Sequence, residues 1–379
     1  MINAGIYIHF PFCNKKCNYC DYFSIEKSNY DLELFTKFLI KEINLSAPLC
    51  KNNWIFDTIY FGGGSPGLLH HNDFDLILNK LFNKFNFSTK VEITIEVNPG
   101  ENSLNDFIEF KKIGVNRLSL GIQTLNPTSL QLLTRDHFTT NYFKTYFDAI
   151  DAGLTNINID LLYNIPGQTI KSWIEDVKSI IQINPSHISI ISLILEPEVR
   201  LNAKLKDQSI PFNSSEIEEE MYREGVKGLQ KSNYLQYEVG HFAKDNMQSR
   251  HSLHYWNLDP YIGLGPSANS YNGLQRWCNV KSLDEYIHNL KNSKLPISNY
   301  EILSEIDKYN EKIINGLRTN RGIYTNEIKE IFITHTFQES LNKWRKYLYI
   351  SSNTISLKKE YFYLTDEIIT DFLIDNSIS

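Results

Sequence analysis

The sequence predicts an α/β protein: a partial (β/α)6 barrel on an open parallel sheet, followed by a C-terminal α+β region of winged-helix-like order. Two observations predict the barrel. Short runs rich in β-branched residues alternate with stretches of helical periodicity through the first half of the chain. We count six such βα units, fewer than the eight of a closed barrel.

The barrel elements follow one another along the chain. Six strands are predicted, at residues 6–10, 57–62, 91–98, 117–124, 156–163 and 187–195. Helices are predicted between them, at about residues 32–47, 72–86, 103–113, 128–151 and 170–183. Gly114 and Gly153 stand where two of these helices should stop.

The alternation ends after residue 200. Residues 202–213 indicate a polar connector, and Ser215 with Glu218 forms a capping box that opens a helix to about Lys231. A second region follows from Tyr237 and includes a glycine turn over residues 261–266. We therefore expect three domains, at residues 1–200, 201–300 and 301–379.

The last of these regions has the element order of a winged helix. Helices are predicted at residues 304–317, 325–332, 337–346 and 366–374, with a hairpin at about 347–365. This order often indicates DNA binding, but residues 301–379 carry 10 basic and 12 acidic residues. We predict a packing or lid module.

Charge and hydropathy exclude further classes of protein. The 38 basic and 44 acidic residues give a net charge of −6, without the positive footprint of a nucleic-acid partner. No apolar run approaches the roughly 20 residues that cross a bilayer. The first residues lack the basic and apolar segments of an export signal. We expect a cytoplasmic protein without stable membrane insertion.

Alternation inside the strands predicts a polar lumen. In the third strand Ile93, Ile95 and Val97 alternate with polar neighbours, and the fourth and fifth strands repeat the pattern. Helices cover the outer face of such a sheet, so the polar side chains must face inward. The sixth strand is the exception, since it is apolar on both faces over residues 190–195. The lumen should hold a polar molecule.

Cys13, Cys17 and Cys20 follow the first strand, with no fourth cysteine nearby. Three thiolates can hold a 4Fe-4S cluster and leave one iron open, whereas a structural zinc site needs four ligands. The alternatives are a Cys3His zinc site that uses His9, or free thiols. Disulfides are disfavoured by five cysteines and by the absence of an export signal.

Further polar residues stand at the ends of the predicted strands. The glycines of residues 62–64 let backbone approach a ligand, although a tight turn alone would also explain them. Glu96, Gln123 and Asp160 lie on the polar face, and Arg135 follows in the next helix. Together they can bind a zwitterionic small molecule with hydroxyls. Individually, each is more often a surface or capping residue.

Several segments resemble the HemN/HemW family of radical S-adenosylmethionine (SAM) proteins, over nearly the whole chain. They are YIHFPFC at residues 7–13, YFGGGSP at 60–66, IEVNP at 95–99, NRLS at 116–119, GIQ at 121–123 and DLLYNIPGQT at 160–169. The resemblance implies that the three cysteines hold a 4Fe-4S cluster whose fourth iron is chelated by SAM. An electron from the cluster then cleaves SAM to a 5'-deoxyadenosyl radical.

The resemblance also implies a set of SAM contacts, some of which can serve a second SAM. They are Tyr7, Tyr19, Gly63, Gly64, Ser65, Glu96, Gln123, Arg135 and Asp160. Cys50 and Cys278 have no partners in this pattern, and we interpret them as structural.

Two branches of the family differ near the cluster. The branch of the anaerobic coproporphyrinogen III dehydrogenase has an N-terminal arm and a fourth cysteine, where this chain has Tyr22. The HemW branch, described as heme chaperones, carries an HNxxYW motif that residues 251–256 resemble. His251 would then be an axial heme ligand. A core or helix-capping histidine is the alternative, and Tyr255 and Trp256 could equally be core.

The chain departs from the HemW pattern at three places. Ser252 replaces the asparagine of the motif, Gly240 and His241 replace the usual Ser-Asn pair, and Asn164 replaces a glycine. The expected function is that of a radical SAM heme chaperone, which binds cluster, SAM and heme and passes heme to an acceptor protein. The alternatives are oxidative decarboxylation of coproporphyrinogen III, with an electron donor, and a cluster-bearing protein without catalysis.

Overall fold

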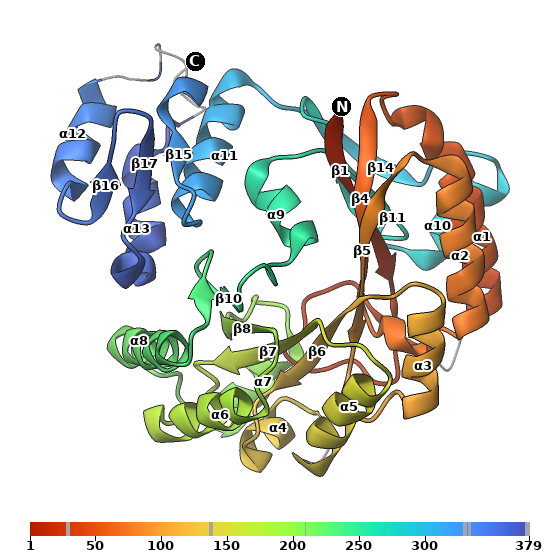
Figure 1. Cartoon of the computed structure of the whole chain (residues 1–379), viewed down its shortest axis with the longest axis horizontal. Helices are drawn as coiled ribbons and strands as arrows, with labels where there is room; N and C mark the ends of the chain where they lie inside the picture. The colour runs from red at the N-terminus through yellow and green to blue at the C-terminus, as the bar shows by residue number, and fades with distance from the viewer. Residues whose placement is uncertain (28–30, 136–138, 209, 329–331, 333–334, 376–379) are drawn as a thin grey trace.

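The computed structural model describes residues 1–27, 31–135, 139–208, 210–328, 332 and 335–375. Within these ranges the largest element is one sheet of twelve strands. Figure 1 shows helices covering its outer side, while the C-terminal region lies apart at the upper left. The predicted fold class is confirmed.

The centre of the sheet is parallel. In spatial order it contains β11 (Tyr261–Leu264), β1 (Ile2–Phe10), β4 (Trp54–Gly63), β5 (Phe87–Val97), β6 (Arg117–Gln123), β7 (Ile157–Tyr163) and β8 (His187–Ser192). All six predicted strands are present, although the sixth stops at Ser192. The glycine turn was predicted too broadly, because Tyr261–Leu264 is a strand that pairs with β1 and the turn begins at Gly265.

Antiparallel strands extend both edges. They are β10 (His241–Ala243) and β9 (Leu235–Gln236) beside β8, and β12 (Asn269–Tyr271), β13 (Gln275–Asn279) and β14 (Ile297–Ile302) beside β11. The sheet therefore continues across residue 200. The division into three domains stays a prediction.

Five helices pack on the outer face. Four lie in the predicted places, namely α1 (Leu32–Ser46), α2 (His71–Lys84), α3 (Leu104–Lys112) and α6 (Ile170–Ile183), and the fifth is α5 (Thr139–Asp151). Lumen-facing and helix-facing residues alternate as predicted, and Ile93, Ile95 and Val97 are buried. Gly114 and Gly153 have φ of 103° and 84°, left-handed conformations that end α3 and α5.

One predicted helix, at residues 128–151, is wrong. The chain forms α4 (Pro127–Leu132) and then α5, with residues 136–138 outside the described ranges. Thr134 has a φ of 56°, which ends α4, so Arg135 lies in a loop rather than in a helix.

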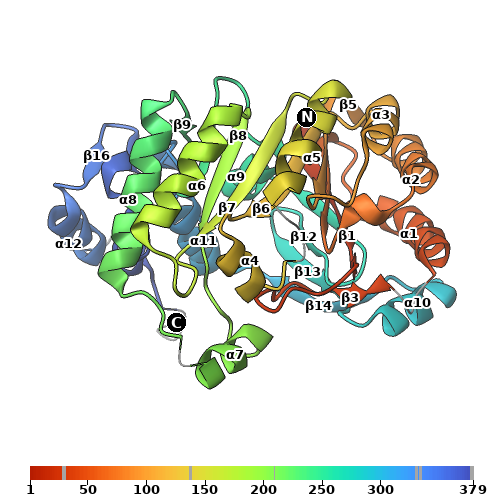
Figure 2. The same cartoon turned by 90° about the horizontal axis from the view of Figure 1, so that it is seen from below.

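The polar connector over residues 202–213 is also wrong, because α7 (Arg200–Gln208) forms there. Leu201 and Leu205 lie one turn apart and are buried together with Leu132, Leu193 and other leucines beside the cysteine loop. Figure 2 shows α7 projecting from the body below α4. Two leucines form an apolar stripe that is too narrow to predict this helix from the sequence.

The capping box at Ser215 is wrong as well. The helix α8 (Ser215–Lys231) has Ser214 as its N-cap residue, without a side-chain cap. Glu218 instead accepts a hydrogen bond of 2.5 Å from Ser192 Oγ at the end of β8. Because the Glu218 carboxylate is bonded to Ser192, it does not cap the N-terminus of its own helix.

The C-terminal region has the predicted winged-helix-like order. It contains α11 (Glu305–Leu317), β15 (Ile323–Tyr324), α12 (His335–Trp344), β16 (Leu348–Ile350), β17 (Thr354–Leu357) and α13 (Thr365–Phe372). Only a 3-10 turn at Thr325–Glu327 represents the helix predicted at 325–332, and residues 329–331 lie outside the described ranges. A 3-10 helix, Lys359–Leu364, replaces the end of the predicted hairpin. In the described residues no helix is long and apolar enough to cross a membrane.

Helix α9 (Arg250–Asn257) packs between the barrel strands and α11 of the C-terminal region. His254 Nε2 lies 2.7 Å from Asp57 Oδ1 on β4, and its Nδ1 lies 2.9 Å from Asp259 Oδ2. Burial alone would lower the pKa of His254, but the hydrogen bonds and charges of Asp259 and Asp57 raise it to about 9. The cationic imidazole therefore anchors α9.

This anchor predicts a stability that depends on pH. The folded pKa of His254 lies above its unfolded value, so its contribution is complete below about pH 6.5 and is lost as the pH rises through about 9. The difference in unfolding free energy between the wild type and His254→Gln should shrink by about 3 kcal/mol over that interval. Chemical denaturation measures it, with His335→Gln on exposed α12 as the control. A pH-independent difference would contradict a cationic anchor.

Candidate functional site

The carboxyl ends of the parallel strands open into a cavity of about 780 Å³. Of the residues predicted to bind cluster or SAM, all except Tyr7 line it: Cys13, Cys17, Tyr19, Cys20, Gly63, Gly64, Ser65, Glu96, Gln123, Arg135 and Asp160. His251 does not line the cavity. The same end of the sheet is where parallel α/β folds place their ligands.

The cysteine loop runs from β2 (Phe12–Cys13) to β3 (Ile25–Glu26), two short strands that pair in parallel. Asn18 holds its middle, because its side chain donates to the carbonyl of Leu132 at 2.7 Å and its carbonyl accepts from the amide of Leu201 at 2.9 Å. The start of α7 is therefore bonded to the loop. Burial raises the pKa of the Cys13 thiol, and it raises the pKa of the Cys20 thiol to about 11.

The donor set fits a cluster better than a single ion. Across the described part of the chain, no three or more His, Cys, Asp or Glu side chains gather where one metal ion could sit. His9 cannot complete a zinc site as it stands, since its Nδ1 lies 3.1 Å from Tyr7 OH and its Nε2 2.8 Å from the carbonyl of Phe23. Three thiols without a fourth ligand match a 4Fe-4S cluster with one open iron. All five cysteines are free.

The glycine loop supports the cysteine loop from below. The amides of Gly64 and Ser65 donate to the carbonyls of Phe10 and Phe12, each at 2.7 Å. A Cβ on Gly64 would lie 2.5 Å from the Phe12 oxygen, and Gly63 has a φ of 106°. These glycines are explained by close backbone contact.

Glu96 lies on the lumen floor. Tyr60 OH donates to its Oε1 at 2.8 Å, and the Gly63 amide donates to its Oε2 at 3.2 Å. Burial raises the pKa of Glu96 to about 7, with a further rise from the charge of Asp160, against the opposing effect of these hydrogen bonds. Glu96 can therefore change charge near neutral pH.

Asp160 is held by a neighbouring strand and its own. It accepts from Ser119 Oγ at 2.9 Å and from Asn158 Nδ2 at 2.7 Å. Elsewhere in the cavity wall, Arg135 donates to Asn98 Oδ1 at 2.5 Å and to Tyr19 OH at 2.7 Å. The cavity thus carries both carboxylates and a guanidinium, as a zwitterionic ligand requires.

Tyr7 and His251 lie together outside the cavity wall. Their rings stack with Tyr60, at centroid distances of 6.2 and 5.1 Å. His251 is 1% exposed, its Nδ1 lies 2.8 Å from Thr58 Oγ1 and its Nε2 lies 2.9 Å from Tyr255 OH. Both ring nitrogens are engaged, which is the geometry of a core histidine. Its neighbour Ser252 does line the cavity.

Among the cavity residues that sequence reasoning missed are Arg117, His187 and His241. Arg117 is 2% exposed, its Nε has no hydrogen-bond partner, and it forms no ion pair with the described residues. His187 and His241 line the cavity beside β8. Position 117 has the same strand parity as 119, 121 and 123, so the alternation of the fourth strand could have revealed Arg117.

Known proteins resemble this chain over most of its length. Residues 7–180 match the family model of the radical SAM superfamily. The chain is 33% identical to the heme chaperone HemW of Buchnera aphidicola subsp. Acyrthosiphon pisum over 335 residues, covering 86% of this chain and 85% of that protein. It is 30% identical to the heme chaperone HemW of Bacillus subtilis over 319 residues, 84% of each chain. The structure of coproporphyrinogen III oxidase (HemN) from Escherichia coli, a radical SAM enzyme, matches with a TM-score of 0.84 at 24% identity, covering 98% of this chain and 90% of that one.

The partial barrel, with a three-cysteine loop at its mouth, is that of a radical SAM protein. More particularly, the chain belongs to the HemN/HemW family of radical SAM proteins. This family implies a 4Fe-4S cluster and SAM.

The charge of Glu96 predicts how SAM binding depends on pH. SAM is a cation at its sulfonium and amino groups, so its affinity should rise as Glu96 loses its proton near pH 7. Glu96→Gln should lower the affinity roughly 10-fold above pH 8 and flatten the dependence, as expected for one charged hydrogen bond. Anaerobic calorimetry measures both, with Glu109→Gln on α3 as the control. Equal affinities in the wild type and Glu96→Gln would remove Glu96 from the site.

Proposed function

We propose that this protein is a heme chaperone of HemW type, which binds a 4Fe-4S cluster, SAM and heme and delivers heme to an acceptor protein. The observation that carries the proposal is that the cysteine loop and the polar lumen share one cavity. The names of the relatives from Buchnera aphidicola and Bacillus subtilis support the heme part. We place its work in the cytoplasm, with acceptor and electron donor as further partners.

The residues of this chain divide the task between them. Cys13, Cys17 and Cys20 would hold the cluster, which when bound supplies single electrons and one open iron. Glu96 and Asp160 line the cavity and would bind the positive groups of SAM, while Arg135 donates to Tyr19 OH and fixes its position. The buried leucines of α7 pack beside the cysteine loop, and α7 would support the loop from that side.

Arg117 supports an anionic ligand deeper in the lumen. The charge of Arg117 acts on Glu96, but its buried guanidinium forms no ion pair with a described residue, and an anionic ligand would supply that partner. SAM and heme both carry carboxylates. The Arg117 side chain is therefore available to either of them, and Arg117→Met should weaken the binding of the one that it contacts.

The alternative is oxidative decarboxylation of coproporphyrinogen III. The likeness to HemN concerns the fold, at 24% identity. Tyr22 stands where that branch has its fourth cysteine, and it lines the cavity. A cluster-bearing protein without catalysis is the remaining alternative.

Thiolate count predicts the cluster. Protein reconstituted without oxygen should bind about four irons and four sulfides, and Cys13→Ser, Cys17→Ser or Cys20→Ser should each abolish the cluster. Cys50→Ser is the matched control, because Cys50 lies away from the cavity with its thiol 3.9 Å from the Ser46 carbonyl. Iron and acid-labile sulfide analysis measures the result. One zinc and no sulfide would contradict the proposal.

A second experiment separates chaperone from oxidase. Reconstituted protein with SAM and dithionite should bind heme and leave coproporphyrinogen III unchanged. Spectroscopic heme titration and chromatography of the porphyrins measure the two outcomes. Formation of protoporphyrinogen would contradict the chaperone assignment and favour oxidative decarboxylation of coproporphyrinogen III.

A further inference from the structure

The lumen face of β8 differs from the other walls of the cavity. His187, Ser189 and Ile191 alternate along this strand and all line the cavity. Strand β10 pairs with β8 so that His241 lies opposite Ser189, and His241 also lines the cavity. This edge of the barrel thus combines two imidazoles with apolar side chains.

A chain of hydrogen bonds beneath this wall fixes the tautomer of His187. Asn158 donates to Asp160 and to Ser119, both at 2.7 Å, so its amide nitrogen is committed. The Asn158 oxygen must then accept, and it lies 2.6 Å from His187 Nδ1. Burial lowers the pKa of His187 well below its ordinary value, which keeps the ring neutral. The proton of His187 therefore sits on Nδ1, and Nε2 is an acceptor.

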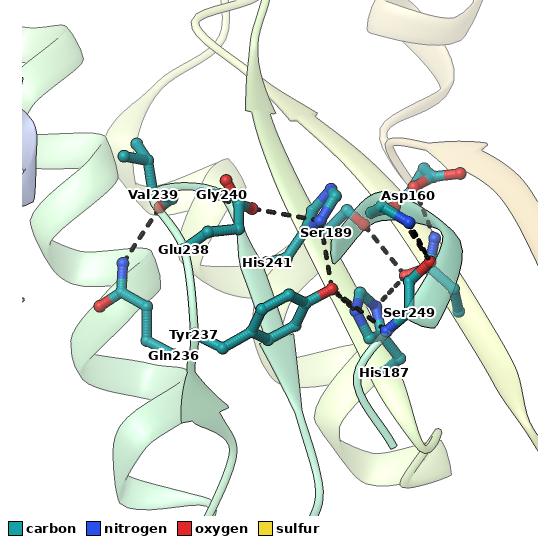
Figure 3. Close-up of polar contacts among 12 residues, drawn as sticks. Asp160, His187, Ser189, Gln236, Tyr237, Glu238, Val239, Gly240, His241 and Ser249 are labelled. Atoms are coloured by element: carbon teal, nitrogen blue, oxygen red, sulfur yellow. Dashed lines mark hydrogen bonds and ion pairs between the residues drawn. The ribbon is translucent and has the colours of Figure 1, made fainter. Parts of the chain in front are cut away.

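The chain continues to His241 through Tyr237, as Figure 3 shows. Tyr237 OH lies 2.8 Å from His187 Nε2 and must donate its only proton there. Its oxygen can then only accept, and it lies 3.3 Å from His241 Nδ1. Nδ1 of His241 therefore carries the proton, and its lone pair lies on Nε2.

Glu238 reinforces this arrangement. Its Oε1 lies 3.2 Å from His241 Nδ1 and also accepts from the Gly240 amide at 3.0 Å. A carboxylate behind an imidazole fixes the tautomer and the orientation of the ring, as in metal-binding histidines. Among the residues that the structure describes, Nε2 of His241 has no hydrogen-bond partner, and the side chain is 24% exposed.

Apolar side chains line the same cavity as this nitrogen. Ile191 is 43% exposed and follows Ser189, the partner of His241, on the same face of β8, and Ile194 beyond the strand is 77% exposed. Exposed isoleucines in a polar lumen suit the face of a large flat ring. An imidazole nitrogen without a partner in the same cavity suits a metal at the centre of that ring.

We propose that His241 Nε2 is the protein ligand of the heme iron, with Ile191 and Ile194 against the porphyrin face. This inference rests on the heme binding of the proposed function and moves the iron ligand from the buried His251 to β10. His241 stands where the resemblance expects an asparagine, so the ligand is a property of this chain. Glu238 and Tyr237 act as positioning residues.

The test compares ferric and ferrous heme bound to full-length, reconstituted protein. His241→Asn should shift the Soret band, remove the iron–histidine stretch from the resonance Raman spectrum and weaken heme binding roughly 10-fold or more. Added imidazole should restore the wild-type spectrum. His335→Asn, an exposed histidine on α12, is the matched control and should change nothing.

Two further variants sharpen the test. His251→Gln should leave the iron–histidine stretch in place. Glu238→Gln should keep the ligand but lower the frequency of that stretch, since a neutral partner polarises the imidazole less. A merely structural role of Glu238 would not move the frequency.

The outcomes distinguish this inference from the proposed function. A wild-type protein that fails to bind heme overturns both. A wild-type protein with a histidine ligand whose spectrum survives in His241→Asn overturns the inference and leaves the heme chaperone in place. Loss of the stretch in His241→Asn with rescue by imidazole, in a variant whose circular dichroism is unchanged, supports it.

Discussion

The close contact between the cysteine loop and the glycine loop is the constraint on which the site depends. Two backbone hydrogen bonds of 2.7 Å join the loops, from Gly64 to Phe10 and from Ser65 to Phe12. A side chain at Gly64 would collide with the Phe12 carbonyl, and one at Gly63 with the ring of His9. Only glycine lets the end of β4 pack this closely against the start of the cysteine loop, whose three cysteines line the lumen.

Buried polar groups shape the rest of the cavity, because each needs a partner away from water. Glu96 depends on Tyr60 and a backbone amide, and Asp160 depends on Ser119 and Asn158. Each hydrogen bond fixes the donor and acceptor of the next one along the chain. Asp160 on β7 therefore determines, through the intervening residues, which nitrogen of His241 on β10 carries the proton. The Arg117 side chain forms no hydrogen bond or ion pair with the described residues, although its charge favours the ionised form of Glu96.

The open side of the barrel is completed by residues far along the chain. β10 brings His241 to β8, α9 brings Ser252 to the lumen, and α7 covers the cysteine loop. The anchor of α9 is electrostatic, through His254 and Asp57. The composition of the cavity is therefore decided jointly by the barrel and the region after residue 200.

Local patterns determined much of this protein. Alternation along Val91–Val97 within β5 and its neighbours placed Glu96, Gln123 and Asp160 on the lumen face, since a strand turns successive side chains to opposite sides. The spacing of Cys13, Cys17 and Cys20 predicted a cluster, because the number of thiol ligands can be read from one short segment of the sequence. Only the tertiary structure decided what depends on pairing between distant segments: strand β11, helix α7, the burial of His251 and the exposure of His241. These follow from contacts between segments far apart in the sequence. A histidine in a sequence looks the same whether it lies buried between Thr58 and Tyr255, as His251 does, or lines the cavity, as His241 does.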